Sequence, residues 1–256
     1  MPNVLIVGAT RGLGYQLAKQ YAQREDSVTG TARSSKPKDA HHDIHWLTGV
    51  DIATESAGAT IAAGLKGHKQ DLVIITAGYF GKESLETPDY EAEVRMYKTS
   101  AIGPVFLVHH LHRAGLLKRG GKIVIVSSES GSITLRHESE GGGMYAHHAS
   151  KAASNMVTKL LSLDLKEEGI AVCAVHPGFM RTEMTAGVGF DKFWDSGGAV
   201  TPDVAAKSLV EWVEAGMDMG RTGQYWAPRG AADIGTAEAV LGVKKEELPV
   251  PLQLPW

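Results

Sequence analysis

The chain has little cysteine, no long apolar run and no cluster of basic residues, and each absence excludes a class of protein. Cys173 is the one cysteine among 256 residues, so no disulfide can form within the chain. No apolar run approaches the length of a membrane span, and the chain enters a predicted strand at Val4 without a basic leader region. We therefore expect no membrane segment and a reducing, cytosolic location. The net charge of −3 gives no sign of a surface for nucleic acid or anionic membrane.

Internal repeats, low-complexity linkers and metal-ligand patterns are missing as well. Histidines gather in residues 41–45 and in residues 109–112, and we interpret both groups as ordinary surface and packing histidines. We predict no metal site. The length suits one large core, so we expect a single domain over residues 1–256.

Short β-branched runs alternate with helix-like stretches along the whole chain. Runs such as Val4–Val7, Leu72–Ile75 and Ala171–Val175 are almost continuously apolar, which is typical of a parallel sheet covered on both faces. The sequence therefore predicts the α/β class, with a doubly wound, Rossmann-type domain whose mostly parallel sheet has helices on both faces. The other predicted strands are 27–32, 44–50, 122–126 and 224–226, and the predicted helices are 13–24, 53–65, two stretches on either side of residues 103–104, 147–167 and 204–215.

Two segments interrupt this alternation. Residues 136–143 are polar and rich in glycine, which indicates a loop. Residues 182–202 are mixed and contain Phe190, Phe193 and Trp194. This second segment is either a lid over a substrate pocket or a surface excursion anchored by a few aromatic side chains.

A glycine-rich turn joins the first predicted strand to the first predicted helix. Its sequence is Gly8-Ala9-Thr10-Arg11-Gly12-Leu13-Gly14. Glycines let the backbone approach a pyrophosphate, and the start of the helix then offers free N–H groups to it. Because the turn has a strand before it and a helix after it, we predict that it binds a dinucleotide. The predicted contacts are Gly8, Thr10, Arg11, Gly12, Leu13 and Gly14.

The end of the second strand indicates which dinucleotide is bound. A site that prefers NAD places an acidic residue there, on the ribose 2′-hydroxyl. No acidic residue lies between Asp26 and Asp39. Arg33, with Arg11 in the turn, can instead donate to a 2′-phosphate. We predict NADP(H) as the cofactor; the alternative is that both arginines are solvated surface charges.

Further motifs resemble those of the short-chain dehydrogenase/reductase family, in particular its NADP-dependent, carbonyl-reductase-like members. The resemblance covers essentially the whole chain and lies in Asp51-Ile52, Ile75-Thr76-Ala77-Gly78, Gly103-Pro104, Ser127-Ser128-Glu129-Ser130-Gly131, Ser150-Lys151-Ala152-Ala153 and Pro177-Gly178-Phe179-Met180-Arg181-Thr182. It implies adenine contacts at Asp51 and Ile52 and nicotinamide contacts at Pro177, Gly178 and Thr182. It also implies cofactor contacts at Ala77 and Gly78, although the two asparagines that precede this Ala-Gly pair in the family are lost.

The resemblance implies a catalytic tetrad, and two of its four positions are altered. Ser128 matches the serine that polarises the carbonyl, and Lys151 matches the lysine that holds the nicotinamide ribose. The family's tyrosine lies four residues before the lysine, where this chain has His147; the family's asparagine aligns with Ser100. Tyr145 lies six residues before Lys151, about 600° around a helix and so on another face.

Three readings of this change remain open: the tyrosine's role is lost, His147 takes it over, or Tyr145 reaches in from an irregular helix start. His147 has a suitable ordinary pKa, near 6.5. However, Lys151 and a cationic nicotinamide nearby would disfavour its charged form. His147 could also do no more than fill the space of the missing ring.

We therefore predict an NADP(H)-dependent oxidoreductase that acts on a carbonyl or alcohol, with His147 as a non-standard proton donor. Two alternatives use the same scaffold: a non-redox cyclase, isomerase or dehydratase, and an NADP(H)-binding regulator. The aromatic residues of the 182–202 segment indicate a small, fairly apolar substrate. The resemblance implies a homodimer or homotetramer that pairs through the helices near residues 103–118 and 147–167.

Overall fold

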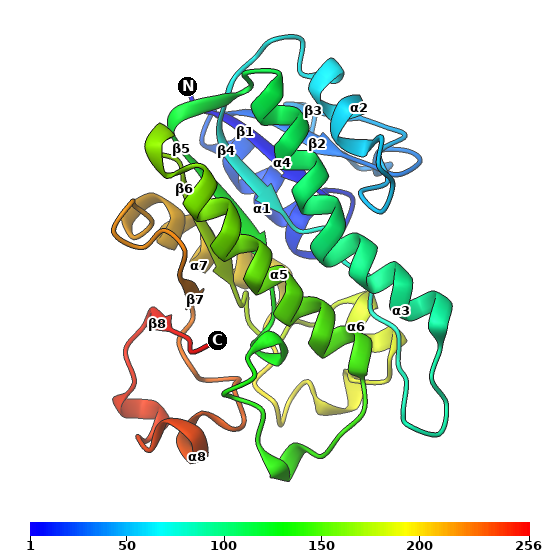
Figure 1. The fold of residues 1–256 in the computed structure, drawn as a ribbon, viewed down its shortest axis with the longest axis vertical. Coiled ribbons are helices and arrows are strands. Elements are labelled where there is room, and N and C mark those ends of the chain that lie inside the picture. Colours follow the sequence, from blue (N-terminus) through cyan, green and yellow to red (C-terminus); the bar gives the residue numbers. More distant parts are fainter.

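One sheet of eight strands runs through the protein. The computed structural model describes residues 1–256, with the strand order β3-β2-β1-β4-β5-β6-β7-β8 (Figure 1). All neighbouring strands are parallel except β7 and β8, so the predicted mostly parallel sheet is confirmed. The strands are β1 (Asn3–Val7), β2 (Ser27–Thr31), β3 (Ile44–Leu47), β4 (Gln70–Ile75), β5 (Leu117–Val126), β6 (Ala171–Val175), β7 (Tyr225–Ala227) and β8 (Leu252–Gln253).

Helices cover both faces of this sheet, as the apolar strands require. On one face α1 packs against α7, and on the other α2 packs against α4, with α5 beside it (Figure 1). Alternate residues of β1 serve the two layers: Val4 and Ile6 belong to one buried cluster, and Leu5 and Val7 to the other. The helices are α1 (Gly12–Gln23), α2 (Ala57–Gly64), α3 (Tyr90–Tyr97), α4 (Gly103–Arg113), α5 (Tyr145–Asp164), α6 (Glu183–Gly187), α7 (Pro202–Ala215) and α8 (Ala237–Leu241).

The strand order places a switch point at β1. From β1 the chain moves outward to β2 and β3 and then returns to β4 on the other side of β1. Ligands of such sheets bind beyond the carboxyl ends of the strands at this point. The start of α5, the short helix α6 and the loops between them lie at that edge, in the lower half of Figure 1.

The helical region around Gly103 differs from the prediction of two separate stretches. A π-helical segment, Lys98–Ile102, joins α3 directly to α4. Gly103 permits this join, because a Cβ atom there would lie 2.2 Å from the backbone oxygen of Ile52. Other differences are shifts of a few residues at element ends, such as α2 beginning at Ala57 and α5 at Tyr145, and the short elements α6, α8 and β8, which were not predicted.

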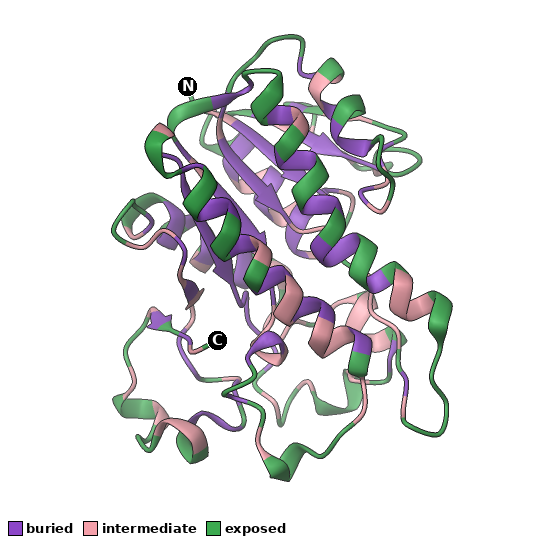
Figure 2. Ribbon diagram, viewed as in Figure 1, coloured by how far each residue is buried: buried purple, intermediate pink, exposed green.

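Burial follows the layers (Figure 2). The strands and the inward faces of the helices are buried, whereas the loops at the carboxyl edge are largely exposed or half-buried. None of the helices combines the length and the apolar character needed to cross a bilayer.

Candidate active site

The turn after β1 has the shape that a pyrophosphate needs. Gly8 has a φ of +94°, and a Cβ atom on it would lie 2.7 Å from the backbone nitrogen of Ala77. A Cβ atom on Gly14 would lie 2.2 Å from the carbonyl oxygen of Gly8. Only glycine therefore fits at these two positions, where the turn, α1 and the end of β4 meet.

Two threonines hold the turn in place. The Gly8 amide donates to Thr31 Oγ1 over 3.0 Å, and Thr76 Oγ1 donates toward the carbonyl oxygens of Val7 and Gly8 over 3.0 and 3.1 Å. Thr76 occupies one of the two positions at which the family resemblance leads us to expect asparagine. Thr76 links the end of β4 to the end of β1 beside Ala77 and Gly78, so the two strand ends are held together although the asparagine is absent.

The start of α1 offers unpaired donors to a ligand. Arg11 is its N-cap residue and makes no side-chain cap, which leaves the first N–H groups of the helix free. Such a helix start, next to a glycine turn at the switch point of the sheet, fits a pyrophosphate. The residues present therefore fit a dinucleotide.

The two arginines at the adenosine end have different surroundings. Arg33 is exposed, forms no ion pair, and begins an exposed segment that also contains Lys36 and Lys38. Arg11 pairs with Glu183 through atoms 2.6 Å apart. Ile52, predicted to contact adenine, is buried next to α4, and Asp51 accepts from the Ala53 amide. Arg33 is thus the arginine that is free to meet a 2′-phosphate.

The segment from residue 182 to 202 lies across this turn. Thr182 caps α6, and its methyl group is 3.7 Å from where a Cβ of Gly12 would be. The Met184 methyl group lies 3.8 Å from the equivalent point on Gly78. With the Arg11–Glu183 pair, these contacts place α6 over the glycines that follow β1 and β4 in the chain.

Lys151 is buried on the side of α5 that faces β5. Its Nζ donates to the carbonyl oxygen of Val126 over 2.8 Å. Burial lowers the pKa of Lys151 to about 8. The ammonium is therefore anchored at the end of β5, next to the predicted catalytic serine.

His147 lies one helical turn before Lys151 and is enclosed by aromatic rings. The imidazole stacks on Phe80, with ring centres 4.0 Å apart, and Phe80 meets Phe190 edge-on at 5.7 Å. Burial, and then the charge of Lys151, lower the pKa of His147 to about 3. The imidazole is therefore neutral at pH 7 and can offer a hydrogen bond but holds no extra proton. Phe190 also connects the 182–202 segment to this wall.

Tyr145 is placed apart from these groups. It is the first residue of α5 and is 43% exposed, and its hydroxyl lies 3.8 Å from where a Cβ of Gly142 would be. No hydrogen bond joins it to Lys151 or Ser128. The structure thus brings His147, and not Tyr145, beside the lysine.

Ser100 lies in the π-helical segment between α3 and α4. It is buried, and its hydroxyl has no partner in the protein. π-Helical turns are frequent at functional sites, and an unpaired buried hydroxyl is suited to hold a water molecule. The family resemblance implies asparagine at this position, and the serine side chain is shorter. A water molecule bound to the Ser100 hydroxyl would bridge the difference in length.

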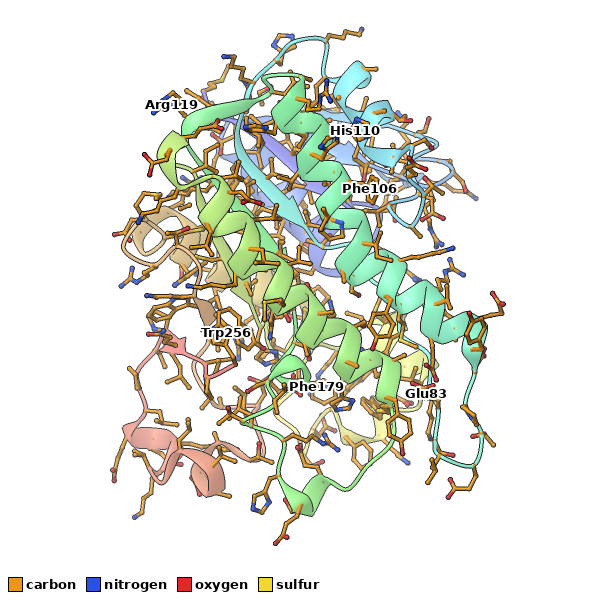
Figure 3. All side chains as sticks on the ribbon, in the orientation of Figure 1. Glu83, Phe106, His110, Arg119, Phe179 and Trp256 are labelled. Atoms are coloured by element: carbon orange, nitrogen blue, oxygen red, sulfur yellow. The ribbon has the colours of Figure 1, made fainter.

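Ser128, directly after β5, has its hydroxyl engaged. Its Oγ donates to Glu129 Oε2 over 2.6 Å, and the Tyr225 hydroxyl donates to the Ser128 carbonyl oxygen. Tyr225 in turn stacks on Trp256, with centres 5.6 Å apart. The C-terminal tail therefore supports the strand end that bears the serine (Figure 3 labels Trp256).

Sequence reasoning missed several residues around this site. Glu129 lies inside the motif of residues 127–131 and His176 directly precedes the motif that begins at Pro177, and these positions were the available signal. Asp233 hydrogen-bonds His176 from a loop 57 residues away, and nothing in the local pattern indicates it. Glu83, labelled in Figure 3, is buried and accepts from the Ala146 amide at the start of α5.

Comparison with known proteins agrees with this geometry. The model of the family described as short chain dehydrogenase matches residues 2–192. A dehydrogenase of 1-hydroxy-2-glutathionyl-2-methyl-3-butene from a Rhodococcus strain is 30% identical over 216 residues, which are 84% of this chain and 91% of the relative. A short-chain dehydrogenase/reductase from Burkholderia multivorans, solved with bound NADP, aligns with a TM-score of 0.73 at 27% identity, over 89% of this chain and 96% of that one. An NADPH-bound carbonyl reductase from chicken fatty liver shares the fold, with a TM-score of 0.76, 24% identity, and coverage of 89% and 96%.

Proposed function

The chain belongs to the short-chain dehydrogenase/reductase family, a family of oxidoreductases that use nicotinamide cofactors, and we propose that it is an NADP(H)-dependent reductase or dehydrogenase of an apolar carbonyl or alcohol. The observation that supports this most is the shared edge: the glycine turn, Ser128, His147 and Lys151 all lie at the carboxyl ends of the parallel strands. The cofactor would transfer hydride there. The unpaired Arg33 supports NADP(H) over NAD(H).

Each residue has a distinct part in this proposal. Lys151, anchored on Val126, would hold the nicotinamide ribose, and Ser128 would contact the substrate oxygen. His147 would donate a hydrogen bond to that oxygen as a neutral imidazole. Pro177, Gly178 and Thr182 would enclose the nicotinamide. The aromatic wall of Phe80 and Phe190 would take the apolar part of the substrate.

The test is NADPH oxidation with a panel of aromatic and aliphatic ketones and aldehydes. The reverse reaction is measured with alcohols, including a glutathione thioether alcohol because of the Rhodococcus relative. We expect Ser128→Ala and His147→Phe to lose about 10²-fold or more of kcat/KM. We expect Tyr145→Phe to retain wild-type activity within about two-fold, because its ring lies outside the site. Loss in Tyr145→Phe alone would instead make Tyr145 the donor.

The neutral state of His147 keeps two other functions in view. A non-redox enzyme would use His147 and Ser128 for acid–base chemistry on a substrate held above the cofactor. A regulator would bind NADP(H) without turnover. Tight NADPH binding with no turnover of any carbonyl or alcohol would favour these two over the oxidoreductase.

A further inference from the structure

A chain of polar groups begins at the half-buried Ser128 and Glu129 and leads away from the substrate edge to the buried side chains of His176 and Asp233. Ser128 Oγ donates to Glu129 Oε2 over 2.6 Å, and that oxygen lies 3.4 Å from His176 Nδ1. His176 Nε2 lies 2.9 Å from Asp233 Oδ2. The four residues come from the ends of β5 and β6 and from the loop after β7, so only the folded sheet brings them together.

The hydrogen bonds define the protonation of the imidazole. The Glu129 amide donates to His176 Nδ1 over 3.1 Å, so Nδ1 is an acceptor and the hydrogen lies on Nε2, facing Asp233. Asp233 also accepts from the Phe179 amide and is almost fully buried. A further proton can bind only at His176 Nδ1, where it would replace the hydrogen bond from the Glu129 amide and face Oε2 of the Glu129 carboxylate, 3.4 Å away.

We propose that Ser128, Glu129 and His176 form a proton relay to the substrate oxygen, with Asp233 holding the imidazole, and that this relay does the work of the tyrosine that the site lacks. The inference rests on the proposed oxidoreductase function. Ser128 is the residue that touches the substrate. Glu129, His176 and Asp233 act through it and are positioning residues in this sense.

The proton path balances in both directions. In alcohol oxidation the substrate O–H bond breaks and its proton goes to Ser128 Oγ, while the serine's own proton moves to Glu129 Oε2 and then to His176 Nδ1. The hydride is taken up by the nicotinamide dinucleotide named above as cofactor. In carbonyl reduction the same bonds form and break in reverse, so the new hydroxyl receives its proton from Ser128.

The surrounding charges favour His176 as the place where the proton rests. Burial lowers the pKa of His176, but the charges of Asp233 and Glu129 outweigh burial and raise it above its ordinary value; Arg229 is the nearby cation that opposes them. Burial raises the pKa of Glu129, but His176 and hydrogen bonds from Ser128 and Ser130 more than reverse this. Glu129 therefore passes the proton on, and His176 keeps it near the operating pH.

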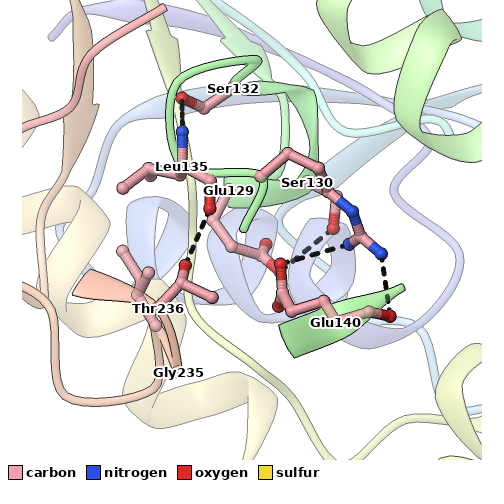
Figure 4. A pocket seen from close by; sticks show the side chains of 9 residues that line it. Glu129, Ser130, Ser132, Leu135, Glu140, Gly235 and Thr236 are labelled. Carbon is pink, nitrogen blue, oxygen red and sulfur yellow. Dashed lines mark hydrogen bonds and ion pairs between the residues drawn. The ribbon is translucent and has the colours of Figure 1, made fainter. Parts of the chain in front are cut away.

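The direction of the Ser128 hydroxyl supports the relay over a purely packing role. Its hydrogen points at Glu129 and one lone pair accepts from the Ser130 amide over 3.3 Å, which leaves the second lone pair to accept the proton of a substrate alcohol. His147 cannot supply the proton as a cation, because its pKa is about 3. Glu129 also lines a small cavity together with Leu135, Glu140 and Thr236 (Figure 4). Glu140 forms an ion pair with Arg136 there and no hydrogen bond or ion pair with the relay residues.

The experiment measures kcat/KM against pH, with alcohol and NADP⁺, for wild type, Glu129→Gln, His176→Asn, Asp233→Asn and the matched control Glu140→Gln. We expect wild type to gain activity as pH rises through the pKa of His176. Glu129→Gln and His176→Asn should lose about 10²-fold of kcat and that pH dependence, with NADP⁺ affinity unchanged. Glu140→Gln should follow the wild-type profile. In parallel, ¹⁵N NMR of the imidazoles should show His176 titrating above its ordinary value, and lower in Asp233→Asn.

Three outcomes would contradict the proposal in different ways. Wild-type turnover with unchanged rate and pH profile in Glu129→Gln overturns the relay and leaves the proposed function standing. An equal loss in Glu140→Gln attributes the effect to packing and also overturns the relay. No wild-type turnover with any carbonyl or alcohol overturns the proposed function, and the relay with it. If His176→Asn fails to fold, the conservative variant Glu129→Gln decides alone.

Discussion

At the scale of single residues, burial decides what a replaced side chain can do. His147 stands where the family has tyrosine, one helical turn before Lys151. The stack on Phe80 and the buried lysine remove the option of a positive charge, which an exposed histidine would have near neutral pH. The imidazole is left as a neutral donor, and the proton must come from elsewhere in the site.

The low pKa of His147 predicts a pH-dependent loss of stability. In the unfolded chain the histidine takes up a proton below about pH 6.5, whereas in the folded protein it stays neutral to about pH 3. Stability that is fully present above pH 6.5 is therefore lost as pH falls toward 3. We measure the free energy of unfolding by urea titration at pH 6.5 and pH 4.5. Between these two values we expect the unfolding free energy of His147→Phe to fall by about 2 kcal/mol less than that of wild type. The control is His68→Phe, because His68 is exposed, and its unfolding free energy should change with pH as in wild type. If the unfolding free energy of His147→Phe also changed with pH as in wild type, the low pKa of His147 would be contradicted.

Arg33 predicts the cofactor preference. It is exposed and unpaired just after the end of β2, where the proposed function places the ribose of the dinucleotide. Replacing it with alanine should weaken NADPH binding about ten-fold through the lost charge-assisted hydrogen bonds, and should leave NADH binding unchanged. Titration of cofactor fluorescence measures both. Lys38→Ala, five residues further along the exposed segment, is the matched control. Equal wild-type affinity for the two cofactors would rule out the preference.

At the scale of elements, the start of α5 determines where the catalytic face points. The helix begins after Met144, which has a φ of +51°, and the buried Glu83 accepts from the Ala146 amide over 2.5 Å. A carboxylate at this end also complements the helix dipole. His147 and Lys151 follow within two turns of this cap. Glu83, from a different part of the chain, therefore fixes the position at which α5 begins and with it the direction in which these two side chains point.

We expect Glu83→Ala to destabilise the protein by about 1–2 kcal/mol, because it removes a helix cap and leaves a buried amide unpaired. Glu83→Gln should lose less, since its amide oxygen can still accept from Ala146. Urea unfolding measures the difference, and Glu86→Ala in the same loop, which is exposed, should stay within about 0.5 kcal/mol of wild type. If Glu83→Ala were as stable as Glu86→Ala, the role of Glu83 as the cap of α5 would be contradicted.

At the scale of the whole molecule, one face is more apolar than a monomer requires. Helices α4 and α5 face the viewer in Figure 1, and apolar side chains of this region stay exposed, among them Phe106, which is labelled in Figure 3, and Leu160. Val108, in the same helix as Phe106, is instead buried in the core. The other exposed members are Ile102, Val105, Met156 and Leu163. Such a face is suited to pairing two copies through α4 and α5.

The assembly is tested by placing a charge on that face. If the chain pairs there, Leu160→Glu should dissociate the homodimer or homotetramer at micromolar concentration, because the carboxylate would be buried without a partner. Leu85→Glu is the matched control, since Leu85 is 76% exposed in the loop before α3 and does not belong to the exposed apolar face of α4 and α5. Sedimentation velocity gives the oligomeric state of each. Wild type that sediments as a monomer would contradict the pairing.

Much of the architecture follows from local pattern. Apolar strands such as Leu72–Ile75 and the glycine turn at Gly8 predicted the parallel sheet, its covered faces and the dinucleotide edge, and the sheet and the family are confirmed. The join of α3 to α4 could not be predicted, since it depends on Gly103 packing against the backbone at Ile52. The cytosolic location and the 2′-phosphate contact stay predictions.

The sequence by itself determined that this chain has the turn, the serine and the lysine of its family and lacks the tyrosine at position 147. These are local facts, and spacing along one helix is enough to establish them. Only the tertiary structure decided how the gap is filled, because the pKa of His147 depends on its burial and on Lys151, and the contact between His176 and Asp233 joins two loops that are 57 residues apart in the chain. Distances between strand ends and the loss of water around a side chain exist only once the sheet is formed.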